Sequence, residues 1–239
     1  MKKIFGWVVL MIMAAGSGWA QEQGKILVFS KTAGYHHASI PAGIAAIREL
    51  GQQHHFQVDT TTAAEWFTTK QLGTYKAVVF LNTSGEVFDS TQKAAFIAYI
   101  RQGGGYMGIH AASTTEYNWP WYGQLAGAWF NGHPKPQEAV VTVTDIRHIA
   151  VSHLPARWRW TDEWYNFKAL PANVRVLLEV DETTYNGGKH GAFHPVAWCG
   201  GFDGGRSFYT ALGHSTDAWR DTLFLQHILG GIRYAMGDE

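Results

Sequence analysis

The sequence predicts an α/β fold, in which a parallel sheet is flanked by helices and carries an antiparallel β extension in the second half. Three observations support this prediction. Short, continuous apolar runs, typical of strands buried on both faces, alternate with helix-like segments in the first half. Strands that alternate with helices favour right-handed crossovers and parallel pairing. In the second half, glycine-rich turns such as Asn186-Gly187-Gly188 separate the strand-like runs, which indicates antiparallel pairing.

The first half contains four predicted strands and two predicted helices. The strands cover residues 25–30, 56–60 and 75–81, and a glycine-rich strand ends at His110. A helix is expected over about 41–51, with Gly51 as its C-cap. A second helix is expected over 90–102, with Ser90 as its N-cap. Binding sites in such sheets lie beyond the carboxyl ends of the strands, so the loops at 36–37, 82–83 and 110 share one edge.

The second half adds four predicted strands and a closing helix. The strands cover 138–144, 173–180, 195–199 and 206–212, and an amphipathic helix runs from 217 to about 234. The sequence contains no clear linker, internal repeat or low-complexity tract. We therefore expect a single domain over residues 21–239.

The composition limits the class of protein. Apolar residues make up 46% of the 239 residues and charged residues only 16%, so a large core is expected and long disorder is not. The 19 basic and 19 acidic residues cancel, which argues against a nucleic-acid partner or an anionic membrane surface. The single cysteine, Cys199, excludes an internal disulfide. Eleven Trp and ten Tyr suit a site that stacks sugar rings, although core packing explains such residues equally well.

The N-terminus has the pattern of a secretory signal peptide over residues 1–20. Lys2 and Lys3 precede an apolar run from 4 to 15, and Gly18-Trp19-Ala20 is an acceptable cleavage site. The apolar run is shorter than the roughly 20 residues that a transmembrane helix needs. We expect a periplasmic or secreted protein without a membrane anchor after cleavage; an uncleaved anchor is the alternative.

His110 is the first candidate catalytic residue. It ends a short apolar strand between the small residues Gly108 and Ala111, which is how a nucleophile elbow exposes a reactive side chain. An imidazole at this position narrows the chemistry to proton transfer or metal ligation. The alternative is a histidine that is hydrogen-bonded to a loop carbonyl.

Three other residues are candidate catalytic groups. His37 lies in the first βα loop and His214 ends a late strand after Gly213, so both are expected at the edge that holds His110. A helix-capping role is the alternative for His37. Glu163 precedes two aromatic residues, and burial against them would raise its pKa and make it a general acid. A solvated carboxylate or an ion pair with Arg206 is equally compatible with the sequence.

Six further residues are candidates for substrate binding. They are Trp121, Tyr122, His133, Tyr165, His194 and Arg206. Trp121 and Tyr122 could stack on a sugar or form a packed lid. His133 and His194 each precede proline, and the extended conformation that this imposes could be their whole role. Arg206 could bind an oxyanion or a sugar hydroxyl, and the sequence is equally compatible with a structural salt bridge at this residue.

Several motifs in one order resemble the ThuA-like (trehalose utilisation) family across about residues 25–235. They are Lys31–Ile40 (KTAGYHHASI), Gly108–Ala112 (GIHAA), Trp119–Ala128 (WPWYGQLAGA), Gly132–Pro134 (GHP), Asp162–Tyr165 (DEWY), His194–Trp198 (HPVAW) and Gly205–His214 (GRSFYTALGH). The resemblance implies a flavodoxin-like sheet similar to class I glutamine amidotransferases. Those enzymes carry a catalytic cysteine at the elbow, where this chain has His110, so glutamine hydrolysis by a thiol at that position is excluded.

The resemblance also implies disaccharide use through 3-keto sugars. A ketone at C3 acidifies the proton on C2, so a base near neutral pKa can remove it and the C1 substituent can leave. We therefore expect an enzyme, a lyase or hydrolase, that acts on a small-molecule carbohydrate. A non-catalytic sugar-binding module is the alternative from another class of protein.

A metal-dependent hydrolase is a third hypothesis. The sequence contains no zincin spacing of histidines and no CxxC pair, and no cofactor is certain. A divalent ion held by His37, His110 and His214 at distant strand ends stays possible, because a parallel sheet brings those ends together. The sequence has no P-loop and no GxGxxG, so nucleotide chemistry is unsupported. It indicates no oligomeric state.

Overall fold

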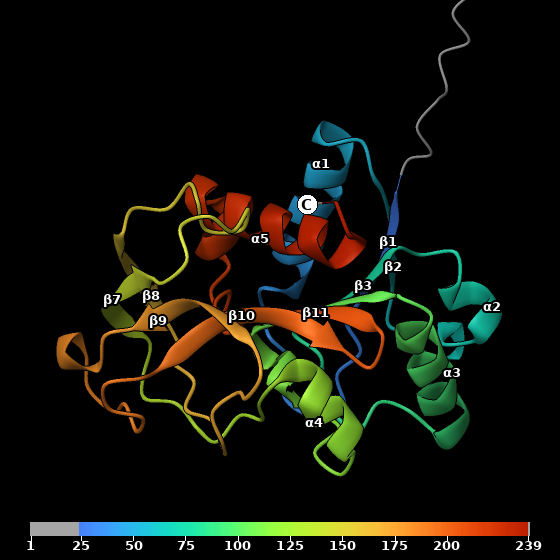
Figure 1. Ribbon diagram of the computed structural model, residues 1–239, viewed down its shortest axis with the longest axis horizontal. Helices are drawn as coiled ribbons and strands as arrows, with labels where there is room; N and C mark the ends of the chain where they lie inside the picture. Colours follow the sequence, from blue (N-terminus) through green and yellow to red (C-terminus); the bar gives the residue numbers. More distant parts are fainter. Residues whose placement is uncertain (1–23, 239) are drawn as a thin grey trace, which may run out of the picture.

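A computed structural model of the chain describes residues 24–238, and its centre is one nine-stranded sheet (Figure 1). In spatial order the strands are β2 (Gln57–Thr61), β1 (Lys25–Phe29), β3 (Ala77–Leu81), β5 (Gly105–Ile109), β11 (Gly205–Thr210), β10 (Pro195–Phe202), β9 (Arg175–Val180), β7 (Gln137–Val143) and β8 (Arg157–Asp162). The first five are parallel, and β10, β9, β7 and β8 continue the sheet antiparallel. The predicted α/β fold with an antiparallel extension is confirmed. The expected signal peptide lies outside the described residues.

Helices form a layer on each face of the sheet. Figure 1 shows α1 (Ile40–Gln53) and α5 (Thr222–Met236) on one face, and α3 (Ser90–Arg101) and α4 (Pro120–Ala126) on the other. The short helix α2 (Thr69–Leu72) lies beside α3, and the two-residue strands β4 (Ser84–Gly85) and β6 (Thr114–Thr115) form a separate small sheet. Helices on both faces explain why β1 and β3 are apolar at nearly every position.

Two predicted helix caps are wrong, by one residue at α3 and by three at α1. The N-cap of α3 is Asp89, because its carboxylate accepts from Gln92 N while the Gln92 side chain accepts from Asp89 N, a reciprocal capping box. Gly51 does not end α1, which continues to Gln53. Its glycine instead permits close approach to the following strand, because a Cβ there would lie 2.7 Å from Phe56 O. The left-handed turn after the helix is made by His55.

The carboxyl ends of the parallel strands meet at one edge of the sheet. Parallel register aligns the last residues of β3, β5 and β11, so the loops that follow them leave side by side. Two of these loops turn sharply at their first residue. Asn82 after β3 and His110 after β5 both have positive φ, which is uncommon for residues with a side chain. Backbone strain of this kind clusters at functional sites.

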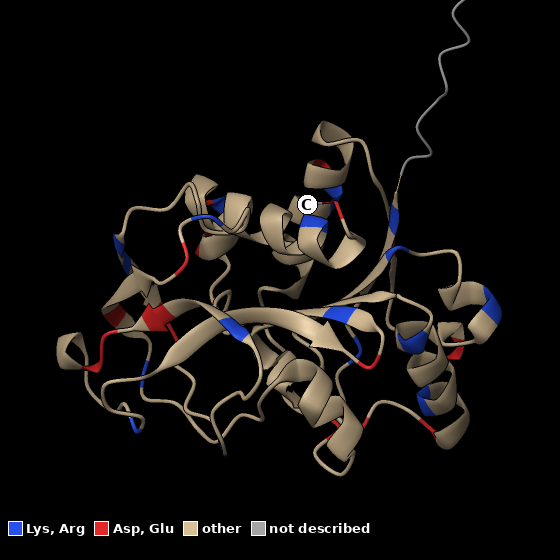
Figure 2. Cartoon of the chain, in the orientation of Figure 1, with Lys and Arg blue, Asp and Glu red and all other residues tan. Residues whose placement is uncertain are grey.

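Charged residues are sparse across the fold. Figure 2 shows them scattered among the elements, with no extended stretch of one sign. Within residues 24–238, none of the helices combines the length and apolar character needed to cross a membrane.

His227 should make the protein sensitive to acid. It is fully buried in α5, where Nδ1 donates to Ala150 O (2.9 Å) and Nε2 accepts from the Thr210 hydroxyl (3.1 Å). Burial lowers its pKa to about 4, below the ordinary 6.5. Between pH 6.5 and pH 4 this histidine is therefore protonated in the unfolded chain but neutral in the folded chain. The free energy of unfolding falls as pH drops through this window, by up to about 3 kcal/mol from this group.

Urea denaturation at pH 7 and pH 4.5 checks this expectation. His227→Gln should be less stable than the wild type at pH 7, yet lose less stability on acidification. His36→Gln, which changes an exposed histidine, should behave as the wild type. Equal acid losses in the wild type and His227→Gln would contradict the prediction.

Candidate functional site

His110 occupies the elbow that the sequence predicts, but its side chain is not exposed. It follows β5 directly, has a φ of +49° and starts a 3-10 turn over His110–Ser113. Its imidazole is 0% exposed, and Nδ1 lies 2.6 Å from Ala211 O, to which it donates. His110 therefore makes the hydrogen bond to a loop carbonyl that the sequence allowed as the alternative to a catalytic role. The expected exposure is wrong because residues from the antiparallel extension cover the elbow.

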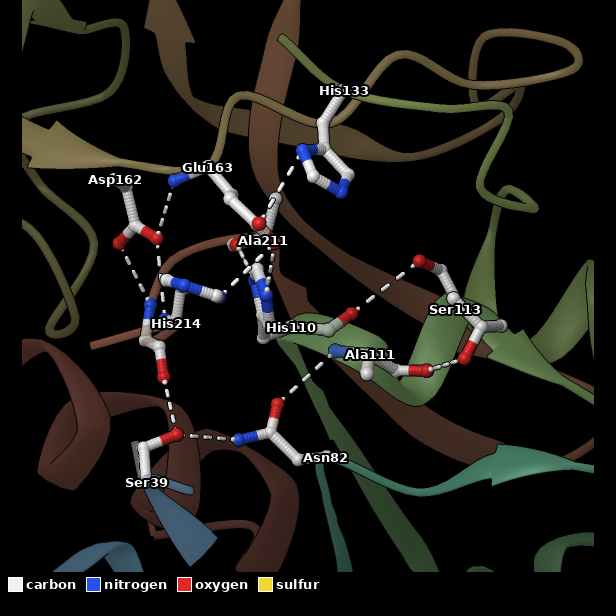
Figure 3. A network of polar contacts seen from close by, with 12 residues as sticks. Ser39, Asn82, His110, Ala111, Ser113, His133, Asp162, Glu163, Ala211 and His214 are labelled. Atoms are coloured by element: carbon white, nitrogen blue, oxygen red, sulfur yellow. Dashed lines mark hydrogen bonds and ion pairs between the residues drawn. The ribbon is translucent and has the colours of Figure 1, made fainter. Parts of the chain in front are cut away.

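Four side chains gather over this elbow. His37 comes from the loop after β1, His110 follows β5, Glu163 follows β8 and His214 comes shortly after β11. Their nearest ligand-type atoms all lie within 4.8 Å of one another. We call these four residues the histidine cluster. Figure 3 shows three of them, with the Glu163 carboxylate close to both His110 and His214.

Glu163 is the hub of the cluster. One carboxylate oxygen, Oε2, lies 3.0 Å from His214 Nδ1 and 3.5 Å from His110 Nε2. The other, Oε1, lies 3.3 Å from His133 Nδ1 (Figure 3). Burial alone would raise the pKa of this carboxyl, but the polar contacts and charges of His110 and His214 hold it well below its usual range. The raised pKa expected for a general acid is therefore not found.

The histidines of the cluster differ in their electrostatics. Burial, with added repulsion from His110 and His214, lowers the pKa of His37 to about 3, so this imidazole is neutral at pH 7. The contact with Glu163 raises the pKa of His214. Three ring nitrogens in the cluster, His37 Nδ1, His110 Nε2 and His214 Nδ1, are buried without a hydrogen-bond partner. The contacts of His110 Nε2 and His214 Nδ1 with Glu163 Oε2 are close in distance but lack hydrogen-bond geometry.

Asp162 fixes two of these residues through the backbone. Its Oδ1 accepts from the backbone N–H groups of Glu163 (2.9 Å) and His214 (3.2 Å). Its Oδ2 accepts from Gly213 N and from the Trp160 indole, each at 2.9 Å. One buried carboxylate thus satisfies four donors and sets the relative positions of Glu163 and His214. This role of Asp162 could not be predicted from the sequence, because the strand that ends at Asp162 was not predicted.

A second network fixes the loops on the other side of the cluster. Asn82 accepts from Ala111 N (3.2 Å) and donates to Ser39 Oγ (3.1 Å), and Ser39 donates to Gly213 O (3.3 Å; Figure 3). These bonds connect the loops after β1, β3, β5 and β11. The left-handed turn at Asn82 aims its amide across the edge. The position of Asn82 at a strand end was the available sequence signal.

A pocket of about 620 Å³ opens beside the cluster. His37, His133 and Glu163 are among its lining residues, and aromatic side chains form much of its wall: Tyr35, Tyr117, Phe130 and Tyr165. Within the described chain, no Lys or Arg lines this pocket. His110 and His214 lie behind Glu163 and are not part of the lining.

Tyr165 and His194 form one unit at this wall. The Tyr165 ring packs on the His110 ring at 4.2 Å between centroids. His194 is fully buried behind it, where Nε2 donates to Tyr165 O (2.8 Å) and Nδ1 lies 2.7 Å from Glu182 Oε1. His194 therefore supports Tyr165 and does not contact the pocket, which corrects its expected role in substrate binding.

Three other predicted binding residues lie away from the pocket. Trp121 donates to Asp203 Oδ2 (2.8 Å) at the far side of α4. Tyr122 is fully buried and donates to Ala112 O (2.9 Å), as a core residue. Arg206 stands at the start of β11, where it donates to Ala235 O (3.2 Å) and Gly103 O (3.2 Å). The start of a parallel strand lies at the opposite edge of the sheet from the cluster, which keeps Arg206 away from it. None of the three residues lines the pocket.

The family model for ThuA, described as trehalose utilisation, matches residues 25–235. The chain belongs to the ThuA family. This confirms the resemblance noted in the sequence. Among curated proteins, none matches this ThuA-family chain.

Solved structures share the fold of this ThuA-family chain. A ThuA-like protein from Bacteroides uniformis is 23% identical, with a TM-score of 0.76 over 92% of this chain and 94% of that one. A ThuA-like protein from Parabacteroides merdae is 21% identical, with a TM-score of 0.75 over 90% and 91%. A β-galactosidase from Bacillus circulans is 13% identical, with a TM-score of 0.57 over 90% of this chain but only 31% of its own. At these identities the likeness shows the fold alone, and it is consistent with a flavodoxin-like sheet.

Asp162→Asn should destabilise the protein strongly. An asparagine keeps one acceptor oxygen, so its NH₂ group would face two of the four donors that the carboxylate satisfies. Hydrogen bonds to charged groups are each worth about 1.5–3 kcal/mol, and we expect a loss of about 3 kcal/mol or more in the free energy of unfolding. Asp59→Asn, at a partly exposed carboxylate bonded to Lys25 on β1, serves as the control in urea denaturation. Similar losses in both variants would argue against a special role for Asp162.

Proposed function

We propose that this protein is a carbohydrate-processing enzyme that acts on oxidised, 3-keto glycosides or disaccharides. One observation carries the proposal: an aromatic-walled pocket opens directly onto a buried group of imidazoles and a carboxylate. Membership of a family described as trehalose utilisation supports a sugar as the ligand. The expected periplasmic or secreted location depends on residues 1–20 and stays a prediction.

The pocket suits a neutral sugar. Its volume of about 620 Å³ lies within the range of small-molecule sites, roughly 300–1,000 Å³. Tyr117, Phe130 and Tyr165 offer aromatic surface to the apolar face of a pyranose, and Tyr35 is 71% exposed at the pocket. The absence of Lys and Arg from the described lining disfavours phosphorylated or acidic sugars, since these need a cationic partner.

The proposed reaction begins at the carbon next to the ketone. A base removes the proton from C2, the electron pair forms a C1=C2 double bond, and the bond from C1 to the glycosidic oxygen breaks. The leaving oxygen takes up a proton and departs as an alcohol. Water that adds across the double bond completes a net hydrolysis; release of the unsaturated ketone makes the enzyme a lyase. The site must supply a base, an acid and stabilisation of the enolate oxygen.

His133 is our candidate for proton transfer. Its Nδ1 lies 2.8 Å from Pro134 O and 3.3 Å from Glu163 Oε1, and both are acceptors. Nδ1 must therefore carry a proton, which leaves Nε2 as the basic nitrogen of the neutral ring at the pocket wall. His110, the base that the sequence suggested, lies one layer deeper, so we propose that it acts on substrate only through Glu163 and its neighbours.

Replacement of His133 should impair turnover more than binding. We expect His133→Gln to lower kcat for a 3-keto disaccharide by about 100-fold or more, because general acid–base groups contribute roughly 10²–10⁴-fold. KM should change little, since the glutamine keeps much of the wall. Trp121→Phe, which alters an aromatic residue away from the pocket, is the matched control and should keep full activity. An unchanged kcat in His133→Gln would remove His133 from the mechanism.

The experiment for the function itself uses trehalose and 3-keto-trehalose in D₂O, followed by NMR. Incorporation of deuterium at C2 of the keto sugar, with or without cleavage, supports proton abstraction. Tight binding by calorimetry without exchange or product would favour the non-catalytic sugar-binding module. Neither binding nor exchange would overturn the proposed substrate class.

A further inference from the structure

One contact in the histidine cluster brings two hydrogen-bond acceptors together. His110 donates its Nδ1 proton to Ala211 O (2.6 Å), so in the neutral ring Nε2 carries only a lone pair. That nitrogen lies 3.5 Å from Glu163 Oε2, which is also an acceptor. Two acceptors facing each other in a buried site repel unless a positive group lies between them.

Two more ring nitrogens of the cluster lack a hydrogen-bond partner. His37 Nδ1 and His214 Nδ1 are buried nitrogens without a hydrogen-bond partner, as is His110 Nε2. His37 is 4% exposed and His110 is 0% exposed, so solvent does not serve either ring. Unsatisfied buried polar atoms are rare in folded proteins, and three in one cluster require a common explanation.

The distances suit a single ion. With metal–nitrogen bonds of about 2.1 Å, tetrahedral ligands lie roughly 3.4 Å apart. His214 Nδ1 and His110 Nε2 lie 3.0 and 3.5 Å from Glu163 Oε2. The whole set lies within 4.8 Å, so contraction by about 1.4 Å at the widest pair would complete the shell.

We infer that His37, His110, His214 and Glu163 bind one divalent transition-metal ion at the bottom of the pocket. Three imidazoles and one carboxylate suit zinc, cobalt, nickel or iron, whereas calcium and magnesium prefer oxygen ligands. The chemical role of the ion depends on the proposed function, but its binding depends only on these four side chains.

The surroundings of the cluster have the organisation of a metal site. Histidine ligands usually donate their second ring N–H to a carbonyl or carboxylate, which fixes the tautomer, and His110 does this with Ala211 O. Asp162 holds the backbone of both Glu163 and His214. A bound ion would polarise the ketone or hydroxyl oxygens of a sugar, and this assigns the enolate-stabilising group that the proposed reaction needs. His133 would remain outside the ligand set, on the pocket wall.

Metal binding to the purified full chain tests the inference without any substrate. The protein is stripped with a chelator, and Zn²⁺ and Co²⁺ are then added separately. We expect one Zn²⁺ per chain by calorimetry and a cobalt visible spectrum typical of nitrogen and oxygen ligands. His37→Ala and Glu163→Gln should each weaken Zn²⁺ binding by about 100-fold or more. His36→Ala, at the exposed neighbour of His37, should bind as the wild type does; circular dichroism confirms that each variant is folded.

The outcomes separate this inference from the proposed function. Folded wild type that binds no Zn²⁺ or Co²⁺, or binding that His37→Ala and Glu163→Gln leave unchanged, overturns the metal site. Sugar exchange that persists in fully stripped protein would also exclude a role of the ion in the reaction, while leaving the carbohydrate function standing. Stoichiometric binding that depends on the cluster supports the site, even if no sugar is turned over.

Discussion

The contact between Asp162 and the loop after β11 is the constraint on which the site depends. Four strand spacings separate β8 from β11 in the sheet order, about 19 Å if the sheet were flat. Yet Asp162 Oδ2 lies 2.9 Å from Gly213 N. The end of β8 and the loop after β11 must therefore approach each other beyond the carboxyl ends of the parallel strands. This approach brings Glu163 to His110 and covers the ends of the parallel strands.

The same contact explains how so many titratable groups can be buried. An unpaired buried charge is expensive, and a carboxylate persists inside a protein only with donors or cations around it. Asp162 has four N–H donors, whereas Glu163 has imidazoles alone. The first arrangement holds the backbone in place, and the second leaves polar atoms free for chemistry. Asp162 and Glu163 are adjacent in the sequence, yet their different hydrogen-bond environments give them different roles.

The sequence predicted the parts of the site that follow from strand topology. His37, His110 and His214 were expected together because parallel strands end at one edge, and the structure brings them within the same cluster. Arg206 was misplaced although its position at the start of a strand already assigns it to the opposite edge. A tyrosine such as Tyr122 can be a core residue or a pocket residue, and the sequence does not distinguish the two, because its burial depends on how α4 packs. The roles of Asp162 and Glu163 depend on long-range contacts between the end of β8 and the loop after β11, which no local pattern encodes.

The wide separation of the cluster residues along the chain has a consequence for biosynthesis. Positions 37, 110, 163 and 214 come from four different connections, and the last of them follows β11. During translation the first two imidazoles emerge long before the carboxylate and the final ring. A half-made chain thus presents at most part of the cavity. The four side chains are therefore assembled only after the last strand, β11, has paired with its neighbours β5 and β10.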